Sequence, residues 1–379
     1  MEKWDAVSCC SLHSHQTGTR AGSVIVFRGV QLTRVLLALL SASLLALLTF
    51  TPAVANRGRL TPAAKAATRA RLVGTAAVAP AAWNQIMGAG DISADPDTTT
   101  TADLATSEIL IQAGPPTVFT AGDNQYPQGQ IGDFTDPDGY AGSWGRAALK
   151  SKTCPTVGNH EYADPLPGPA GYLAYFKPPC PHRPDIEYAK TSSGAIIPTV
   201  YAFRAAPGSG WWGYVLDSEC NHSGWEPGPD CSRSGNQLNW FRSHMAAHPA
   251  RCRIVFYHHP RFGNGAPFGD DSQVYWLYAV AASGGRASLI INGHNHAYER
   301  FTSMTVTGAL DTSYTAPRSI TVGTGGAPLI KFSKPARTGT RYRDASHYGV
   351  LRITLGPGYW STEFDRTDGE IADRASAGC

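Results

Sequence analysis

The sequence is poor in charge, and its charged residues do not gather. Asp, Glu, Lys and Arg together make up 16% of the 379 residues, and the formal net charge is +3. Runs of Lys and Arg are absent, and the aromatic residues do not alternate with basic ones. We therefore expect no nucleic-acid-binding surface. The hydrophobic share of 42% excludes a disordered or fibrous chain and predicts a globular fold with a core.

The sequence also lacks the apolar run that a membrane span requires. Residues 35–50 form an uncharged, largely apolar run of 16 residues, whereas a spanning helix needs about 20. Arg28 and Arg34 precede it, and Ala53-Val54-Ala55 form a small-x-small cleavage site. We predict that residues 1–55 are a signal peptide with a long N-terminal extension, cleaved after Ala55; a buried core helix is the alternative. The mature protein would be secreted, with no stable membrane association.

Cysteine pairs with metal-binding spacing are absent as well. None of the eight cysteines has C-x-x-C spacing, so a thiolate zinc site is not predicted. Six cysteines follow the predicted cleavage site: Cys154, Cys180, Cys220, Cys231, Cys252 and Cys379. An even number in an exported chain predicts disulfides, with free buried thiols as the alternative. Because Cys220 and Cys231 flank a short loop rich in Gly and Pro, we predict this bridge, with Cys231–Cys252 as its competitor.

The remaining chain is predicted to be a linker at 56–85 followed by one mixed α/β domain at 86–379. Short apolar runs at 117–120, 156–157, 254–257 and 289–291 end abruptly in polar residues, as buried strands do. Such strand ends are where open α/β sheets place their ligand sites. Apolar residues recur at helical spacing in two stretches: Leu238, Phe241 and Met245, then Val274, Leu277 and Tyr278. Further strands are predicted at 320–322 and at the alternating residues Leu351, Ile353 and Leu355.

Five short segments hold the candidate metal ligands. They are Gly-Asp at 90–91, GDNQY at 122–126, GNHE at 158–161, YHHP at 257–260 and GHNHAYER at 293–300. A glycine before the ligand permits a sharp turn with φ values that other residues avoid. Carboxylate oxygens and imidazoles suit divalent and trivalent first-row metals. The histidines outside these segments are predicted to have no metal role: His182, His222, His244, His248 and His347.

The spacing of His294 and His296 adds an expectation about geometry. If the segment is extended, residues i and i+2 share a face, and the two imidazoles can serve two neighbouring metals. A helical H-x-x-x-H pair would instead suit a single zinc ion.

These ordered segments resemble the calcineurin-like metallophosphoesterase superfamily, and GDNQY and GHNHAYER resemble its purple acid phosphatase branch. The resemblance extends from about residue 88 to the C-terminus and includes ITVGTGG at 320–326. It implies an α/β fold of four layers, an αββα sandwich of two mixed β-sheets flanked by helices.

The resemblance also implies a role for each site residue. Two metal ions would be bound, a ferric ion and a divalent iron, zinc or manganese ion. The first would be held by Asp91, Asp123, Tyr126 and His296, and the second by Asn159, His258 and His294, with Asp123 bridging both. His160 would contact the substrate phosphate. His258 is the better ligand of the pair 258–259, because it stands two residues before Pro260.

The predicted function is that of a secreted phosphatase. It would hydrolyse small phosphate monoesters through attack of a metal-bound hydroxide. No Ser or Cys stands in a recognisable nucleophile elbow. The sequence does not identify the general acid that protonates the leaving group, because residues 265–269 lack the additional histidines of the plant enzymes. The alternatives are a phosphodiesterase with the same metals and a non-catalytic binding protein on this fold.

Overall fold

The computed structural model describes residues 84–95, 101–206, 208–220, 225, 228–264, 269–283 and 287–379. The chain divides into two units, 1–56 and 57–379, and every described residue belongs to the second. The predicted signal peptide and linker residues 56–83 lie outside the described residues.

The first of two β-sheets has six strands in the order β14-β13-β12-β1-β2-β3. Their bounds are β1 Gln85–Ala89, β2 Thr117–Thr120, β3 Thr153–Cys154, β12 Gly349–Gly356, β13 Tyr359–Arg366 and β14 Ile371–Gly378. Strands β1, β2 and β3 run parallel, whereas β12 pairs antiparallel with β1. The sheet is therefore mixed, and the carboxyl ends of its three parallel strands lie at one edge.

The second sheet has eight strands in the order β11-β9-β10-β8-β7-β6-β5-β4. Their bounds are β4 Glu187–Lys190, β5 Ile196–Ala206, β6 Trp211–Val215, β7 Arg253–Phe256, β8 Leu289–Asn292, β9 Tyr298–Phe301, β10 Arg318–Val322 and β11 Thr340–Asp344. Strands β6, β7, β8 and β10 are parallel, and the outer strands pair antiparallel.

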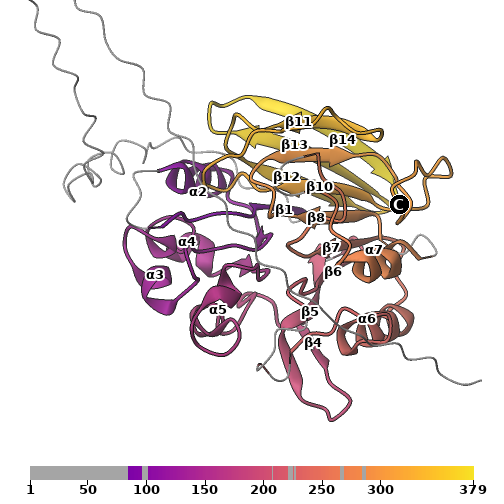
Figure 1. The fold of residues 1–379 in the computed structure, drawn as a ribbon, viewed down its shortest axis with the longest axis horizontal. Helices are drawn as coiled ribbons and strands as arrows, with labels where there is room; N and C mark the ends of the chain where they lie inside the picture. The colour runs from indigo at the N-terminus through magenta and orange to yellow at the C-terminus, as the bar shows by residue number, and fades with distance from the viewer. Residues whose placement is uncertain are drawn as a thin grey trace, which may run out of the picture. The chain divides into compact units, whose positions relative to one another are not determined.

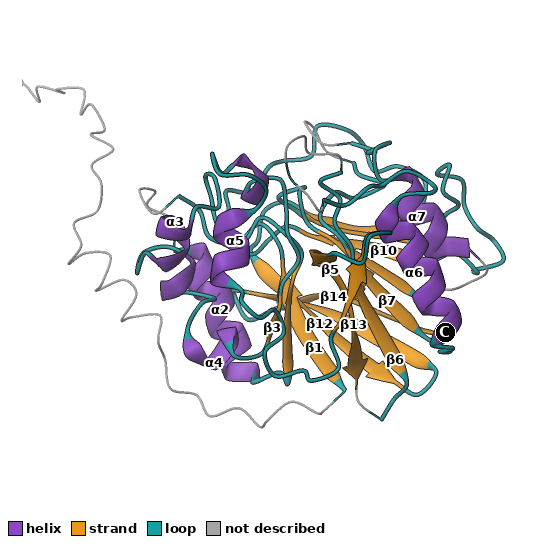
Figure 2. Ribbon diagram, turned by 90° about the horizontal axis from the view of Figure 1, so that it is seen from below, coloured by secondary structure: helices purple, strands orange, loops and turns teal. Residues whose placement is uncertain are grey.

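Helices cover the two sheets from opposite sides (Figures 1 and 2). On one side lie α2 Ala102–Ala113, α3 Ile131–Thr135, α4 Ala147–Lys150 and α5 Ala170–Tyr175. On the other side lie α6 Asn236–Ala247 and α7 Tyr275–Ala282. The predicted four-layer sandwich is confirmed, and both predicted helices are present.

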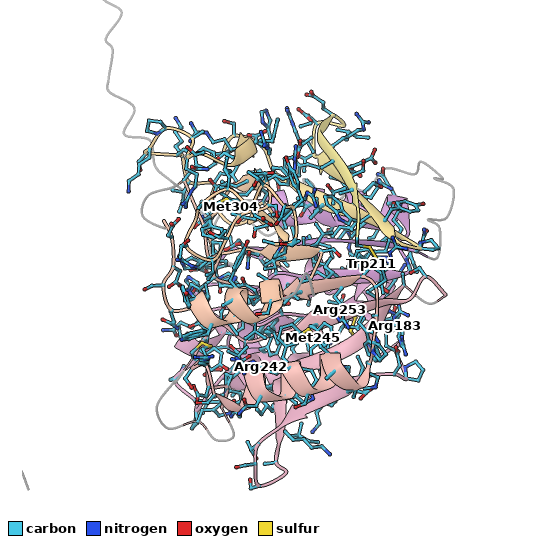
Figure 3. All side chains as sticks on the ribbon, turned by 90° about the vertical axis from the view of Figure 1, so that its right-hand side faces the viewer. Arg183, Trp211, Arg242, Met245, Arg253 and Met304 are labelled. Atoms are coloured by element: carbon cyan, nitrogen blue, oxygen red, sulfur yellow. A yellow bond between two sulfur atoms is a disulfide. The ribbon has the colours of Figure 1, made fainter. Side chains whose placement is uncertain are left out.

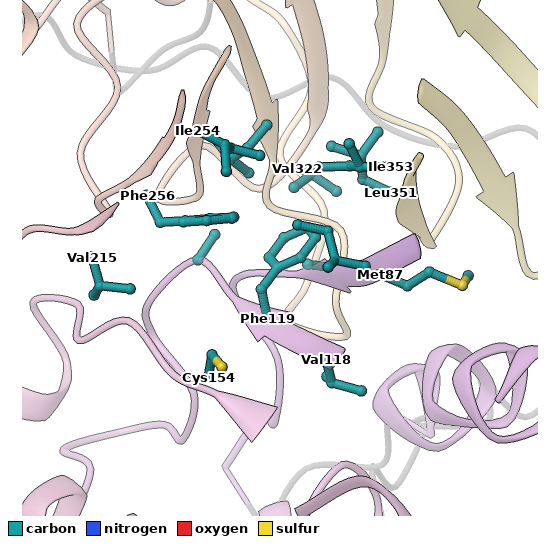
Figure 4. Close-up of a cluster of buried hydrophobic side chains, with 14 of the residues drawn as sticks. Met87, Val118, Phe119, Cys154, Val215, Ile254, Phe256, Val322, Leu351 and Ile353 are labelled. Atoms are coloured by element: carbon teal, nitrogen blue, oxygen red, sulfur yellow. The ribbon is translucent and has the colours of Figure 1, made fainter. Parts of the chain in front are cut away.

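The central core lies between the two sheets (Figure 4). Phe119 of β2 packs on Phe256 of β7, with ring centroids 5.1 Å apart, and so joins one sheet to the other. The alternating residues Leu351, Ile353 and Leu355 of β12 are fully buried in the same core. A second cluster fills the space between the eight-stranded sheet and helices α6 and α7. Burial on both faces of the sheets explains their nearly continuous apolar strands.

One predicted strand is wrong. Residues 156–157 lie outside the sheet, because β3 ends at Cys154 and the next residue, Pro155, has no N–H for the ladder. The N–H of Thr156 is instead donated to Oγ1 of Thr120, at 3.0 Å.

Three disulfides join the six described cysteines: Cys154–Cys180, Cys220–Cys231 and Cys252–Cys379. The predicted pair Cys220–Cys231 is confirmed. The competing pair Cys231–Cys252 is wrong, because the fold carries the C-terminal residue after β14 to Cys252. Within the described ranges, no helix combines the length and the apolar composition that crossing a membrane would require.

Candidate metal centre

Four strand ends deliver polar side chains to one place. Asp91 follows β1, Asp123 follows β2, His258 follows β7 and His294 follows β8. Three of these residues have left-handed backbones, with φ of 55° at Asp91, 48° at Asp123 and 67° at His294. A non-glycine residue in this region is strained, and such strain gathers at functional sites.

The glycines before these residues act differently from the sequence prediction. Of Gly90, Gly122, Gly158 and Gly293, only Gly122 has a positive φ, at 86°. The sharp turn instead falls mainly on the polar residues themselves. Gly158 is required by close approach, because a Cβ there would collide with the backbone nitrogen and Oδ1 of Asp123.

A first group of polar atoms surrounds the hydroxyl of Tyr126. This oxygen lies 3.1 Å from Oδ1 of Asp91, 3.0 Å from Oδ2 of Asp123 and 2.9 Å from Nε2 of His296. Nε2 of His296 lies 3.3 Å from Oδ1 of Asp91. The four residues that the sequence assigns to one metal therefore converge.

A second group surrounds the side-chain oxygen of Asn159. Oδ1 of Asn159 lies 3.2 Å from Nε2 of His258 and 3.0 Å from Nδ1 of His294. Nε2 of His258 lies 3.2 Å from Oδ2 of Asp123. The two groups therefore meet at Oδ2 of Asp123, which contacts a member of each.

Backbone carbonyls fix the orientation of two imidazoles. Nδ1 of His258 lies 2.8 Å from the carbonyl oxygen of Ala121, and Nδ1 of His296 lies 2.8 Å from that of Pro328. A carbonyl can only accept a hydrogen bond, so each Nδ1 carries the proton. When these rings are neutral, Nε2 is left as a bare nitrogen that faces the groups, as in many metal-binding histidines.

The electrostatics of the cluster fit cations. Burial opposes ionisation of Asp123, but His258 and His160 outweigh it and hold the Asp123 pKa well below its ordinary value. Burial likewise opposes a charge on His258, yet Asp123 raises the pKa of His258 to about 10. Burial, with His259 and His258, lowers the pKa of His294 to about 2, so that this ligand candidate is neutral. Positive charge is thus required beside the buried carboxylates, and the oxygen and imidazole donor set suits two first-row metal ions.

Tyr126 is a phenol in this setting. Burial, then Asp123 and Asp91, raise its pKa well above the ordinary value, so that without a cation the hydroxyl stays protonated. Only a strongly polarising cation would favour the phenolate.

His160 lies beside the cluster. Its Nε2 is 3.9 Å from Oδ2 of Asp123, and its ring packs against that of Tyr126 with centroids 4.1 Å apart. Nδ1 is held 2.6 Å from the carbonyl oxygen of Pro127, and a third of the side chain is exposed. His160 therefore presents an edge to solvent beside both groups.

Sequence reasoning quoted Glu161 within a motif but gave it no role. One carboxylate oxygen accepts the backbone N–H groups of Asn124 and Gln125, at 2.6 and 3.2 Å, and the other accepts that of Gly158, at 2.7 Å. Glu161 thus ties the loop after β2 to the loop after β3. The one sequence signal for Glu161 was its place at the end of the GNHE segment.

The sequence analysis preferred His258 to His259 as a ligand and gave His259 no other role. Its ring lies 4.0 Å from that of His294, and its Nδ1 lies 2.8 Å from Oε1 of Glu219 and 3.1 Å from Oγ of Ser218. Residues 218–219 stand near no motif, so no sequence signal pointed to this contact.

The conditional expectation for His294 and His296 is wrong in its geometry. The positive φ of His294 turns the backbone, so the segment is not extended before β9 begins at Tyr298. The two imidazoles reach different groups because the chain bends between them.

Comparisons with known proteins agree with this geometry. The family model described as calcineurin-like phosphoesterase matches residues 90–298. No curated protein matches the chain. A purple acid phosphatase from yellow lupin, Lupinus luteus, has a similar fold, with a TM-score of 0.54 and 16% identity over 78% of this chain and 53% of that one. This chain therefore spans about half the length of the lupin enzyme.

A second solved structure with the same fold is GAP50, described as the anchor in the inner membrane complex of Plasmodium. Its TM-score is 0.54, at 13% identity over 78% of this chain and 88% of that one. Both likenesses concern the fold, whereas the family model covers more than half of this sequence and includes the loops that carry Asp91, Asp123, Asn159, His258 and His294. The chain belongs to the calcineurin-like phosphoesterase family.

Proposed function

We propose that this protein is a secreted phosphatase that hydrolyses small phosphate monoesters with two metal ions. Asp91, Asp123, Tyr126 and His296 would hold a ferric ion, and Asn159, His258 and His294 a divalent iron, zinc or manganese ion. The observation that carries the proposal is the position of Oδ2 of Asp123, 3.0 Å from the Tyr126 hydroxyl and 3.2 Å from Nε2 of His258. One carboxylate oxygen thereby reaches both ligand groups, as a bridging ligand must.

The chain's own residues would position the two ions. Two bound ions supply charge neutralisation for phosphate oxygens and lower the pKa of water. The carbonyls of Ala121 and Pro328 aim His258 and His296 by accepting their Nδ1 protons. The backbone N–H of His160 donates to Oδ1 of Asp123, at 2.9 Å, which leaves Oδ2 of Asp123 to face both groups.

His160 would act on the substrate. Its Nδ1 donates to the carbonyl of Pro127, and the ring packs at a tilt against that of Tyr126, so Nε2 is held at the exposed side of the centre. From there it can donate a hydrogen bond to a phosphoryl oxygen or a proton to the leaving group.

Residues 86–379 would form the catalytic domain behind a cleaved signal at 1–55. The three disulfides support an exported protein, because such bridges persist in oxidising compartments. In that environment, the bridge between Cys252 and Cys379 would hold the last strand, β14, in place.

Two rival functions are tested by the same experiment. The mature protein, loaded with iron and zinc, is assayed on an aryl phosphate monoester and on the matched diester, and its metals are counted. Turnover of the monoester in proportion to metal content supports the proposal. Preference for the diester favours a phosphodiesterase, and metal without turnover of either ester favours a binding protein. N-terminal sequencing of protein from the culture medium tests secretion, with Asn56 expected first.

A further inference from the structure

A cluster of three side chains that can bind a metal lies on the outer side of the eight-stranded sheet, among residues that the proposed function does not use. Glu187 stands in the edge strand β4, His244 stands in the last turn of α6, and His248 is the residue directly after that helix. Figure 3 looks onto α6 and α7 and labels Met245 and Arg253 where α6 meets the sheet. The backbone N–H of His248 still donates to the carbonyl of His244, at 2.9 Å, so the two residues lie one turn apart on the same side, and their rings stack.

The distances match a tetrahedral metal site. Nε2 of His244 lies 3.3 Å from Oε2 of Glu187, and Nε2 of His248 lies 3.5 Å from Oε1. Zinc bonds of about 2.0–2.1 Å place neighbouring tetrahedral ligand atoms about 3.3 Å apart. The three ligand atoms lie within 4.8 Å of one another. A single ion can therefore reach all three with small side-chain adjustments.

Hydrogen bonds at the far ring nitrogens leave the near ones available. Nδ1 of His248 lies 3.1 Å from the carbonyl oxygen of His244, which can only accept, so that nitrogen carries a proton. Nδ1 of His244 lies 3.2 Å from the hydroxyl of Tyr214. Nε2 of His244 is buried and faces Oε2 of Glu187. When Nδ1 of each ring carries the proton, Nε2 is the bare nitrogen, as is usual in metal-binding histidines.

Packing holds the two rings in place. They stack with centroids 4.1 Å apart, and each lies 4.9 Å from the ring of Trp212. The side chain of His244 is 4% exposed, whereas that of Glu187 is 46% exposed. The cluster is therefore rigid on the protein side and open to solvent at Glu187, where an ion can enter and a water can complete its coordination.

Two arginines face the cluster and oppose a cation. Arg204 lies over Trp212, with its guanidinium carbon 4.1 Å from the ring centroid. Arg253 donates to the carbonyls of Met245, His248 and Ala250 at the end of α6, where the helix dipole partly offsets its charge. Burial, then His248, lower the pKa of His244, which keeps its imidazole in the neutral form that a metal requires.

We propose that Glu187, His244 and His248 form a third metal site, suited to zinc, that joins the edge strand β4 to the end of α6. The site is separate from the phosphoesterase centre and does not depend on the proposed function. Two imidazoles, one carboxylate and a water give the mixed nitrogen and oxygen donor set that zinc accepts.

Zinc content tests this proposal. The mature protein, without a polyhistidine tag, is dialysed against zinc, freed of unbound metal and analysed by mass spectrometry for metal per chain. His248→Gln should carry about one ion fewer than wild type, with Kd for zinc at this site raised at least about 100-fold. His347→Gln is the matched control, because His347 is half-exposed and pairs with Asp344 elsewhere. It should carry as much zinc as wild type.

Glu187→Gln provides a second variant at an exposed position, where folding is not at risk. It should also lose the ion, and cobalt-loaded protein should lose the visible absorption of one low-coordinate cobalt site in both variants. Any phosphatase activity should stay within about twofold of wild type, whether that activity is high or absent, which separates this proposal from the proposed function. Equal zinc in wild type, His248→Gln and Glu187→Gln would overturn the third site.

Discussion

The hydroxyl of Tyr126 lies 3.0 Å from Oδ2 of Asp123. Oδ2 of Asp123 also lies 3.2 Å from Nε2 of His258, which belongs to the other ligand group. Asp123 reaches this position through a left-handed backbone, with φ of 48°, and through the close approach of Gly158. The local strain is explained if a bridging carboxylate is what the site requires.

Asp123→Ala should therefore lose at least one metal ion and about 1,000-fold or more in turnover, because charge neutralisation depends on the shared oxygen. Metal content and kcat on an aryl phosphate check this. Asp368→Ala is a suitable control, since Asp368 lies in an exposed turn between β13 and β14 and pairs with Arg366. Two ions per chain with wild-type turnover in Asp123→Ala would refute the bridge.

His160→Ala should behave differently. Nε2 of His160 lies 3.9 Å from Asp123, to the side of both groups, so the variant should keep two ions and lose about 100-fold or more in turnover. If His160 protonates the leaving group, the loss should be greater for an alkyl phosphate than for an aryl one, whose leaving oxygen needs no proton. An equal loss on both esters would exclude His160 as the proton donor and would leave the hydrogen bond to phosphoryl oxygens as its role.

The strand ends of the fold were predictable because each apolar run stops at a polar residue. The runs at 117–120 and 289–291 became β2 of the six-stranded sheet and β8 of the eight-stranded sheet. Parallel neighbours align their carboxyl ends, which brings Asp91 close to Asp123 after β1 and β2, and His258 close to His294 after β7 and β8. The packing of the two sheets then brings these two pairs together. The strand at 156–157 failed because the prediction ignored Pro155.

Contacts between distant segments were not predictable. Glu219 reaches His259 because β6 and β7 are parallel neighbours, a pairing that no local pattern specifies. The histidines at 244 and 248 have the helical spacing that suits one zinc ion, but their potential third ligand is Glu187, far away in sequence on β4. Spacing on one helix gives two ligands, and only the tertiary structure supplies the third.

Tyr126→Phe tests the ferric site. A phenolate bound to ferric iron absorbs visible light, so iron-loaded wild type should be pink to purple and the variant colourless. Asp91, Asp123 and His296 remain, so most of the iron should stay bound. Tyr314→Phe, at a tyrosine that is 59% exposed, should keep the colour. Colourless wild type with iron confirmed in the first site would exclude the phenolate ligand.

The disulfides should differ in their effect on stability. Cys252–Cys379 closes a loop with a sequence separation of 127, whereas Cys220–Cys231 closes one of 11. Chain entropy predicts a loss of about 5 kcal/mol in the free energy of unfolding for the first and about 3 kcal/mol for the second. Chemical denaturation of the two double Cys→Ala variants measures both losses. A larger loss for Cys220–Cys231 would contradict the loop-length argument.

The last prediction concerns Asp217, a buried carboxyl group near the centre. Its Oδ2 accepts a hydrogen bond from the Tyr162 hydroxyl at 2.6 Å, and its Oδ1 accepts one from the N–H of Glu219 at 2.9 Å. Burial outweighs these bonds and raises the pKa of Asp217 from 3.8 to about 7. The folded state therefore holds this proton to a higher pH than the unfolded state does.

The sign of the effect on stability follows from that difference. Between about pH 4 and pH 7 the folded protein binds more protons at this position, so the free energy of unfolding falls as pH rises. Below that window both states are protonated, and above it both are ionised. Asp217→Asn removes the titration while keeping the shape, because the Tyr162 hydroxyl can accept from the new amide group.

We therefore compare the free energy of unfolding of Asp217→Asn with that of wild type at two pH values. The difference, variant minus wild type, should be about 3 kcal/mol larger at pH 8 than at pH 5. Urea denaturation at both pH values gives this double difference, in which all other titrating groups cancel. Asp311→Asn is the control: the N–H of Ala316 and the hydroxyl of Ser313 hold the Asp311 pKa below its ordinary value, so its effect should be constant over this range. A constant difference for Asp217→Asn as well would mean that the buried carboxyl group is already ionised at pH 5, stabilised by its two hydrogen bonds.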